Sequence, residues 1–333
     1  MAYRRFSDVH EIRRPVPEPG DGEVRVRIGV AGINPADWKN RLRYTGHAPV
    51  VPLQDGAGVI DAVGPGIDAS RVGERVWLWE TARQRCGGSA QEFSIVPTEN
   101  AVQLPDGVGL EVGACLGVPA VTAHRCLTVA ERGPDRLTPG SLAGQTVLVA
   151  GGAGAVGHAA IQLARWGGAT VITTVSTPDK AALAEAAGAH HVVHRRDGDA
   201  GSVVRQLAPT GVNIAVELAP DHNTELDLGV LAPGGTVAVY AGRAANTFSL
   251  EISGPMMLNA RWQFVSIFTM PPAAKRCAVD AITLALDAGV LDVGRSAGLP
   301  LHRHPLSDLG RAFEAVKQGA IGKVLVDVCP ALT

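Results

Sequence analysis

A glycine-rich stretch near the middle of the chain has the spacing of a phosphate-binding loop. Residues 152–157 read Gly-Ala-Gly-Ala-Val-Gly and match the pattern G-x-G-x-x-G. The stretch directly follows the apolar run at 146–150 and opens a segment with apolar residues at helical spacing. Glycines permit a tight turn and let the backbone approach a pyrophosphate, whose charge then faces the N-terminus of a helix. The pattern predicts a dinucleotide-binding site, and a purely structural strand-to-helix turn is the less favoured interpretation.

The residue at the end of the next predicted strand bears on which dinucleotide would bind. An NAD site usually places Asp or Glu there, roughly 20 residues beyond the glycines, to bind the ribose 2′-hydroxyl. This chain has Ser176 at that place. Asp179 is better explained as a first-turn acid of the following helix, with Thr177 as its N-cap and Pro178 at its first position. The lack of an acid at the strand end disfavours NAD.

Cationic side chains nearby favour the phosphorylated cofactor. Lys180 lies in the first turn of the same predicted helix, where the positive helix end is locally unfavourable for it. A 2′-phosphate would explain its presence, and Arg195 or Arg196, after the third strand, could bind that phosphate with two hydrogen bonds. Taken singly, each cation is more simply a solvated surface charge. Taken together, with no acid at the strand end, they predict NADPH.

The segments around the glycine loop are typical of an α/β domain. From about residue 120 onward, apolar strands alternate with helices, which predicts a parallel sheet with right-handed crossovers. Because the strands are apolar without interruption, both faces of the sheet should be covered. The predicted strands are 146–150, 169–175, 192–193, 212–218, 236–240 and 263–269.

The two ends of the chain have a different character. Residues 23–30 alternate polar and apolar side chains, as a half-buried strand does, and similar short pieces follow, bounded by Gly, Pro, Asp or Asn. These pieces, at 59–63, 75–79 and 92–96, predict a compact β-rich domain. Towards the C-terminus we expect a helix at 273–288, a helix from a Ser307 cap through 318, and a closing strand at 322–328.

Composition excludes several classes of protein. A length of 333 residues fits two domains at roughly 150 residues each. The formal net charge of −2 gives no field that would attract a polyanion, so nucleic-acid partners are not expected. No apolar run reaches the ~18 residues that span a bilayer, and the N-terminus has no apolar signal core, so we expect a cytoplasmic protein without membrane contact. The five cysteines have no C-x-x-C spacing, which disfavours a disulfide framework or a zinc knuckle.

Several segments resemble the quinone oxidoreductase and zeta-crystallin branch of the medium-chain dehydrogenases/reductases. Residues 31–37, Ala-Gly-Ile-Asn-Pro-Ala-Asp, look like the "AGxNPxD" segment of that branch, and 55–64 are similar to its catalytic core. Residues 147–165 look like its cofactor domain, and Gly322-Lys323-Val324 like its C-terminus. The resemblance implies a Rossmann doubly wound parallel sheet at 122–270, inserted in a β-rich GroES-like catalytic domain formed by 1–121 plus 271–333.

The resemblance also implies a protein that works without zinc. Zinc-dependent relatives place a Cys where this chain has Asn34, and a His-Glu pair where it has Gln54 and Asp55. Amides bind zinc poorly, and the four-Cys lobe is missing too. Two histidine groups without an obvious third ligand are interpreted as structural or exposed: His190, His191 and His194, and the pair His302 and His304.

Carried over position by position, the resemblance implies three sets of cofactor contacts. The pyrophosphate loop would contribute Ala153, Gly154, Ala155 and Val156. The adenosine ribose and its phosphate would be surrounded by Ser176, Lys180 and Arg195. The remaining contacts would come from Asn223, from the turn Tyr240, Ala241, Gly242 and Arg243, and from Val265, Ser266 and Ile267 beside the nicotinamide carboxamide.

Three residues are candidates for the substrate pocket. Asn34 could donate a hydrogen bond to a developing oxyanion, although satisfying the turn before Pro35 is an equally good explanation. Thr122 could contact the nicotinamide or start a helix. Tyr44 could replace the cofactor-facing Tyr of the family, which this chain lacks.

These residues lead to a hypothesis about function. Without zinc there is no Lewis acid to polarise a simple ketone, whereas a conjugated acceptor takes up hydride with less help. We therefore expect NADPH-dependent quinone reduction. The alternatives are an enoyl or alkenal/one reductase of a biosynthetic pathway and a non-catalytic, crystallin-like NADPH-binding protein. The resemblance further implies a homodimer, because relatives pair the edge strand predicted here at 263–269 across a two-fold axis.

Overall fold

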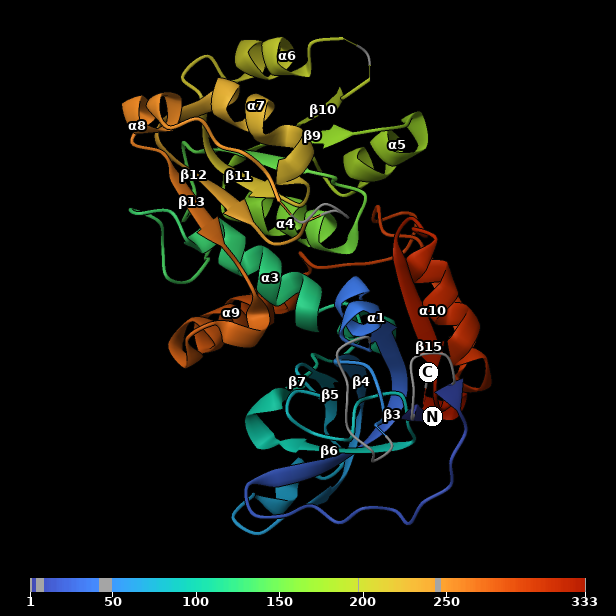
Figure 1. Ribbon diagram of the computed structural model, residues 1–333. Helices are drawn as coiled ribbons and strands as arrows, with labels where there is room; N and C mark the ends of the chain where they lie inside the picture. Colours follow the sequence, from blue (N-terminus) through green and yellow to red (C-terminus); the bar gives the residue numbers. More distant parts are fainter. Residues whose placement is uncertain (1, 4–8, 42–49, 197, 243–246, 333) are drawn as a thin grey trace. The chain divides into compact units, whose positions relative to one another are not determined.

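The computed structural model describes residues 2–3, 9–41, 50–196, 198–242 and 247–332 (Figure 1). The chain forms two compact units. The first unit consists of Met1–Val118 and Pro300–Thr333, and the second unit of Pro119–Leu299. Among the described residues, no helix combines the length and the apolar character that crossing a membrane requires.

The second unit is built on a six-stranded parallel sheet. In sheet order the strands are β10 (His191–His194), β9 (Thr170–Val175), β8 (Thr146–Ala150), β11 (Val212–Glu217), β12 (Leu231–Val239) and β13 (Arg261–Phe264). Numbered along the chain, this is the order 3-2-1-4-5-6 of the doubly wound dinucleotide-binding fold. All residues of β8 after the first are buried, and because successive side chains point to opposite faces, both faces are covered. The predicted Rossmann architecture is confirmed.

Helices precede, connect and follow these strands. Along the chain they are α3 (Gly117–Thr128), α4 (Ala155–Trp166), α5 (Pro178–Ala186), α6 (Ala200–Leu207), α7 (Pro220–Val230), α8 (Ser253–Leu258) and α9 (Pro272–Asp287). The start of α5 is as predicted: the Thr177 side chain accepts a hydrogen bond from the Lys180 N–H, and Pro178 occupies the first turn. The predicted strand 263–269 is wrong in extent, because β13 already ends at Phe264 and Ile267–Thr269 form a 3₁₀ turn.

The segment after α9 packs within the second unit, whereas the sequence had assigned residues 271–299 to the catalytic domain. The His158 ring Nε2 on α4 lies 2.7 Å from the Ala297 carbonyl oxygen, and the Gln162 amide donates to the Asp292 carbonyl at 3.2 Å. Gly298 lies so close to α5 that a Cβ there would come within 2.2 Å of the Leu183 carbonyl oxygen. These contacts join distant parts of the sequence, so strand and helix periodicity could not reveal them.

The first unit contains a mostly antiparallel sheet. Its path runs β14 (Leu301–Pro305), β15 (Lys323–Asp327), β3 (Glu23–Ile33), β4 (Asp55–Val63), β5 (Arg75–Leu78) and β7 (Ala101–Gln103), with β6 (Phe93–Pro97) also paired to β3. A small sheet of β1 (Ala2–Tyr3) and β2 (Val9–His10) precedes it. The C-terminal strand β15, red in Figure 1, pairs antiparallel with the N-terminal strand β3, blue in Figure 1. The two ends of the sequence thus build one sheet.

In its described part, this unit also contains the helices α1 (Pro35–Arg41), α2 (Leu110–Gly113) and α10 (Leu309–Lys317). One face of α10 is buried, at Leu309, Ala312 and Phe313. The predicted Ser307 cap is wrong. Ser307 belongs to the 3₁₀ turn Leu306–Asp308, and Asp308 is the residue that precedes the helix. The turn and the helix follow each other without a break, which hides the boundary in the sequence.

Candidate functional site

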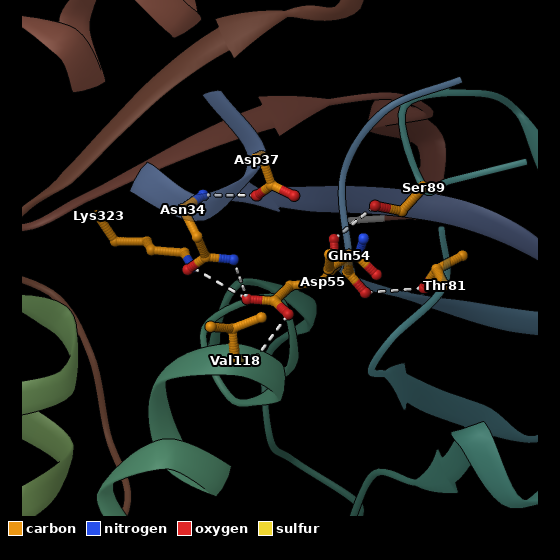
Figure 2. A network of polar contacts seen from close by, with 8 residues as sticks. All are labelled: Asn34, Asp37, Gln54, Asp55, Thr81, Ser89, Val118 and Lys323. Atoms are coloured by element: carbon orange, nitrogen blue, oxygen red, sulfur yellow. Dashed lines mark hydrogen bonds and ion pairs between the residues drawn. The ribbon is translucent and has the colours of Figure 1, made fainter. Parts of the chain in front are cut away.

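A buried polar network lies where three strands of the first unit meet (Figure 2). Strand pairing places Val324 opposite Ile33 and Gly32 opposite Asp55, so Lys323, Asn34 and Asp55 come together. The Lys323 ammonium donates to Asn34 Oδ1 at 2.7 Å and to Asp55 Oδ2 at 3.2 Å, and Asn34 Nδ2 donates to Asp55 Oδ2 at 2.7 Å. All three side chains are at most 3 % exposed. The ammonium and the carboxylate therefore balance each other's charge in a site that excludes water.

The second oxygen of Asp55 is also occupied. Its Oδ1 accepts the backbone N–H of Val118 at 2.8 Å. Two glycines make room for the charged pair: a Cβ at Gly117 would lie 2.3 Å from Asp55 Oδ1, and a Cβ at Gly32 would lie 2.9 Å from Lys323 Cε. Because every polar atom of the Asp55 carboxylate has a donor, the buried charge is compensated as a stable core requires.

Asp37, in the first turn of α1, adds a second buried carboxyl group. Its Oδ2 accepts the backbone N–H of Asn34 at 2.8 Å. Burial, and next the negative charge of Asp55, raises the pKa of Asp37 to about 7. The carboxyl group therefore carries its proton over much of the acidic range and titrates near neutrality.

Gln54 immediately precedes β4 and is held by the loop after β5. Its backbone carbonyl accepts from the Thr81 N–H at 3.1 Å and from Thr81 Oγ1 at 2.9 Å. Its side-chain Oε1 accepts the Ala82 N–H at 3.1 Å. Next to it, Ser89 Oγ donates to the Asp55 carbonyl at 2.6 Å. Gln54 was noticed in the sequence only as a departure from a zinc ligand, since the contacts that orient it come from a loop 27 residues away.

Two of the three predicted substrate-pocket residues lie in the described part of the chain. Asn34 uses its amide oxygen and one amide N–H inside the network, which leaves one N–H for its predicted role. Thr122 is buried in the middle of α3 in the second unit, so the interpretation as a helix start is wrong. Tyr44 lies outside the described residues, as does Arg243 among the predicted cofactor contacts.

The glycine loop of the second unit connects β8 to α4 and fits a dinucleotide. A Cβ at Gly157 would lie 2.4 Å from the Gly151 carbonyl oxygen, and one at Gly152 would lie 2.4 Å from Thr173 Oγ1, so both glycines are required by packing. Gly154 differs: it is exposed, and a Cβ there would meet nothing of the chain closer than 3.5 Å. It precedes α4 and provides no side-chain cap. The first N–H groups of α4 are thus open to an anion.

The predicted adenosine-side residues come together at the carboxyl ends of β9 and β10. The Lys180 ammonium donates to Ser176 Oγ at 3.3 Å. The Arg195 backbone N–H donates to the Val175 carbonyl at 2.9 Å, which places this exposed residue beside the end of β9. A hydroxyl group and two cations thus occupy the edge where a ribose 2′-substituent is bound in this fold.

Sequence reasoning missed a buried carboxyl pair at the end of β11. Asn223 Nδ2 donates to both carboxylate oxygens of Glu217, at 3.0 and 2.9 Å. Burial raises the pKa of Glu217, and burial together with the Glu217 charge raises that of Asp227 well above its ordinary value. The predicted cofactor residue Asn223 thus faces a carboxylate of its own unit. The signal in the sequence was an acid that follows three apolar residues at the end of a strand, beside the point where the strand order reverses.

The remaining predicted cofactor contacts also lie at the carboxyl edge of this sheet. The Tyr240 N–H donates to the Glu217 carbonyl at 3.0 Å, and burial raises the pKa of the Tyr240 phenol. Ala241 and Gly242 follow it and are half-buried. The Val265 N–H donates to the Val239 carbonyl at 2.7 Å, Ser266 is exposed, and Ile267 is buried. Contact of these residues with a cofactor stays a prediction.

Histidines and acids do not form a metal cluster in the described part of the chain. No group of three or more His, Cys, Asp or Glu there could hold a metal ion. Two of the histidines considered in the sequence have backbone partners instead. His190 Nδ1 accepts the Val171 N–H at 3.0 Å, and His302 Nε2 lies 2.8 Å from the Ile321 carbonyl oxygen.

The raised pKa of Asp37 predicts a pH effect on stability. Between the ordinary carboxyl pKa of 3.8 and about 7 the folded protein binds more protons than the unfolded chain, so its free energy of unfolding falls as pH rises through this window. Asp37→Asn keeps an oxygen for the Asn34 N–H and cannot ionise. Urea unfolding at pH 5, 6, 7 and 8 should therefore show the wild type losing stability relative to the variant. Parallel curves would contradict the raised pKa.

Comparisons with known proteins match segments in both units. Residues 20–106 match the alcohol dehydrogenase GroES-like domain, and residues 155–283 match the zinc-binding dehydrogenase family. The human quinone oxidoreductase is 29 % identical, covering 93 % of this chain and 91 % of its own length. A 2-haloacrylate reductase from a Burkholderia species is 30 % identical and covers 86 % of each chain.

A solved structure extends the likeness over both units. A mycobacterial protein in complex with NADPH superposes with a TM-score of 0.77 at 27 % identity, covering 97 % of this chain and 96 % of its own. The predicted combination of a GroES-like domain and a Rossmann domain is confirmed. The chain therefore belongs to the medium-chain dehydrogenase/reductase family of oxidoreductases, in its quinone oxidoreductase branch.

Proposed function

We propose that this chain is an NADPH-dependent, zinc-independent oxidoreductase that reduces a quinone. The observation that carries the proposal is the network of Asn34, Asp55 and Lys323. The Lys323 ammonium lies 2.7 Å from Asn34 Oδ1 and 3.2 Å from Asp55 Oδ2, so it already supplies the positive charge that balances Asp55. The Asn34 side chain carries an amide, which binds zinc poorly. This donor set suits an internal ion pair and is a poor set of zinc ligands.

The second unit supports NADPH as the reductant. When bound, NADPH supplies a hydride. The open N–H groups at the start of α4 would hold its pyrophosphate, while Ser176, Lys180 and Arg195 would hold the 2′-phosphate. Relatives solved with NADPH, from mycobacteria among them, are consistent with this assignment. Since the protein offers no Lewis acid in this proposal, a conjugated acceptor that delocalises the incoming charge is the suitable substrate.

The likeness to a 2-haloacrylate reductase favours a second candidate acceptor. That name describes reduction of a double bond conjugated to a carboxyl group, so an enone or enoyl compound is the alternative for this chain. Both candidates share a conjugated carbonyl oxygen that gains negative charge when hydride arrives.

We also propose a homodimer formed along β13. No strand pairs with the outer edge of β13 within the described ranges. Phe264 on this strand is 63 % exposed, and Met256 and Met257 on the neighbouring α8 are 64 % and 79 % exposed. An open strand edge flanked by exposed apolar side chains is suited to pairing with a second copy.

The activity is tested by following NADPH oxidation by absorbance. We expect turnover with an ortho-quinone and NADPH, and much slower turnover with NADH, because only NADPH carries the 2′-phosphate. A preference for an alken-2-one would instead favour the enone candidate. Tight NADPH binding without turnover of either acceptor would contradict both and favour a non-catalytic role.

The cofactor preference is tested by Lys180→Ala combined with Arg195→Ala. Removing two charged donors should weaken NADPH binding at least about tenfold and leave NADH binding nearly unchanged. Fluorescence titration measures both dissociation constants. Arg196→Ala serves as the matched variant, since it removes a neighbouring exposed arginine. Equal losses for the two cofactors would mean that these cations do not bind the 2′-phosphate.

The dimer is tested by light scattering at micromolar concentration. The wild type should have twice the mass of the chain, and Phe264→Glu should shift it to the monomer because a charge would be buried at the pairing edge. A wild type that is purely monomeric under these conditions would rule the proposed interface out.

A further inference from the structure

The backbone around Gln54 is fixed in an unfavourable conformation. Leu53 has φ of +79°, in the left-handed region that costs a non-glycine residue on the order of 1–2 kcal/mol. Neighbouring backbone holds it there: the Ser89 N–H donates to the Leu53 carbonyl at 3.0 Å, and the Ala90 N–H to the Pro52 carbonyl at 3.1 Å. Gly88 is required, because a Cβ would lie 2.2 Å from the Pro52 carbonyl oxygen. Strain that the surroundings enforce is characteristic of functional sites.

The side-chain amide of Gln54 is oriented as well. A backbone N–H can only donate, so the atom that faces the Ala82 N–H at 3.1 Å is Oε1, and Nε2 points the other way. In the part of the chain that the structure describes, no hydrogen bond is made by Nε2, although Gln54 is only 8 % exposed. The Nε2 atom itself is not fully buried, so water can accept its hydrogen bonds until a ligand does. An acceptor from a ligand would take the place of that water while the contact with Ala82 keeps the side chain in the same orientation.

The neighbouring polar groups have less to offer a ligand. Asn34 uses its oxygen and one N–H in hydrogen bonds with Lys323 and Asp55. The Asp55 carboxylate already accepts hydrogen bonds from Asn34, Lys323 and Val118 (Figure 2). Gln54 keeps both of its amide N–H groups. It is thus the network residue with the most unused donor capacity, and its direction is fixed before a ligand arrives.

We propose that Gln54 Nε2 donates a hydrogen bond to the carbonyl oxygen of the electron acceptor and stabilises the negative charge that forms there, an inference that rests on the proposed function. When a hydride is delivered, a new C–H bond forms on the acceptor and a π-electron pair moves to its carbonyl oxygen. The acceptor is reduced by two electrons, and its oxygen anion then takes a proton from solvent. Gln54 transfers no proton in this step.

The expected loss of rate on removing the Gln54 amide can be estimated from other oxyanion donors. Removing one preorganised oxyanion donor costs roughly 10²–10³ in rate in enzymes whose site excludes water. Gln54 is slightly exposed, so a loss of about ten- to hundredfold in kcat/KM for the quinone is expected. NADPH affinity should not change, since Gln54 is not among the proposed cofactor contacts.

Two variants test this role. Gln54→Met removes both amide donors at similar length. Gln54→Glu keeps an oxygen for the Ala82 N–H but presents a carboxylate that repels an oxyanion, and a donor only when it is protonated. We expect Gln54→Met to lose about ten- to hundredfold in kcat/KM, and the rate of Gln54→Glu relative to Gln54→Met to rise as pH falls. Asp37, Asp55 and Lys323 are present in both variants, so the two variants differ in ionisable groups only at position 54.

Controls separate this inference from the proposed function. Gln103→Met makes the same chemical change at an exposed position of β7 and should retain wild-type kcat/KM. Thermal unfolding and the NADPH dissociation constant confirm that each variant is folded. If the wild type reduces the quinone and Gln54→Met does so within twofold, or if both Gln54 variants share one pH profile, the role of Gln54 is overturned while the proposed function stands. A wild type that reduces neither acceptor overturns the proposed function and this inference with it.

Discussion

The ion pair between Lys323 and Asp55, joined through Asn34, ties the two ends of the chain into one sheet. Lys323 opens the last strand, Asp55 opens β4, and Asn34 directly follows β3. Moving two charges into a core costs several kcal/mol per ion, and the attraction between them offsets this cost only where the geometry is good and the remaining lone pairs are filled. Here the Val118 N–H and the Asn34 amide fill them. A one-residue shift of β15 along β3 would turn Lys323 to the other face of the sheet and leave Asp55 without this partner.

The buried ion pair explains several neighbouring features. Gly32 and Gly117 lack side chains because a Cβ at either would strike the charged groups or the adjoining backbone. Asp37, buried beside a carboxylate that is already paired, has a raised pKa. Gln54, one residue before Asp55, is held against the loop at Thr81 and Ala82 instead of joining the pair. Fixing the charged core therefore also fixes the orientation of the amide that precedes it.

In the second unit, the proposed pyrophosphate site depends mainly on backbone groups. Its strand order reverses between β8 and β11, and the glycine loop, Ser176 and Glu217 all lie at carboxyl ends of strands there. The open N–H groups of α4 favour an anion, while the buried acid Glu217 ends the next strand, β11, and the buried Asp227 lies on α7. Asn223 donates to the Glu217 carboxylate through Nδ2. This contact therefore also fixes the direction of the Asn223 amide oxygen.

The sequence by itself determined what depends on neighbours along the chain. The glycine loop, the Thr177 cap and the strand–helix alternation are local patterns, because each rests on backbone geometry or side-chain period over a few residues. Tertiary structure decided what depends on distant partners. Lys323 and Asn34 are separated by 289 positions, so no local pattern could show that the lysine neutralises Asp55 or occupies the amide of Asn34. The same holds for Glu217 beside Asp227 and for residues 291–298 against α4 and α5. Burial and charge compensation are properties of the packed core, and they exist only once the strands have met.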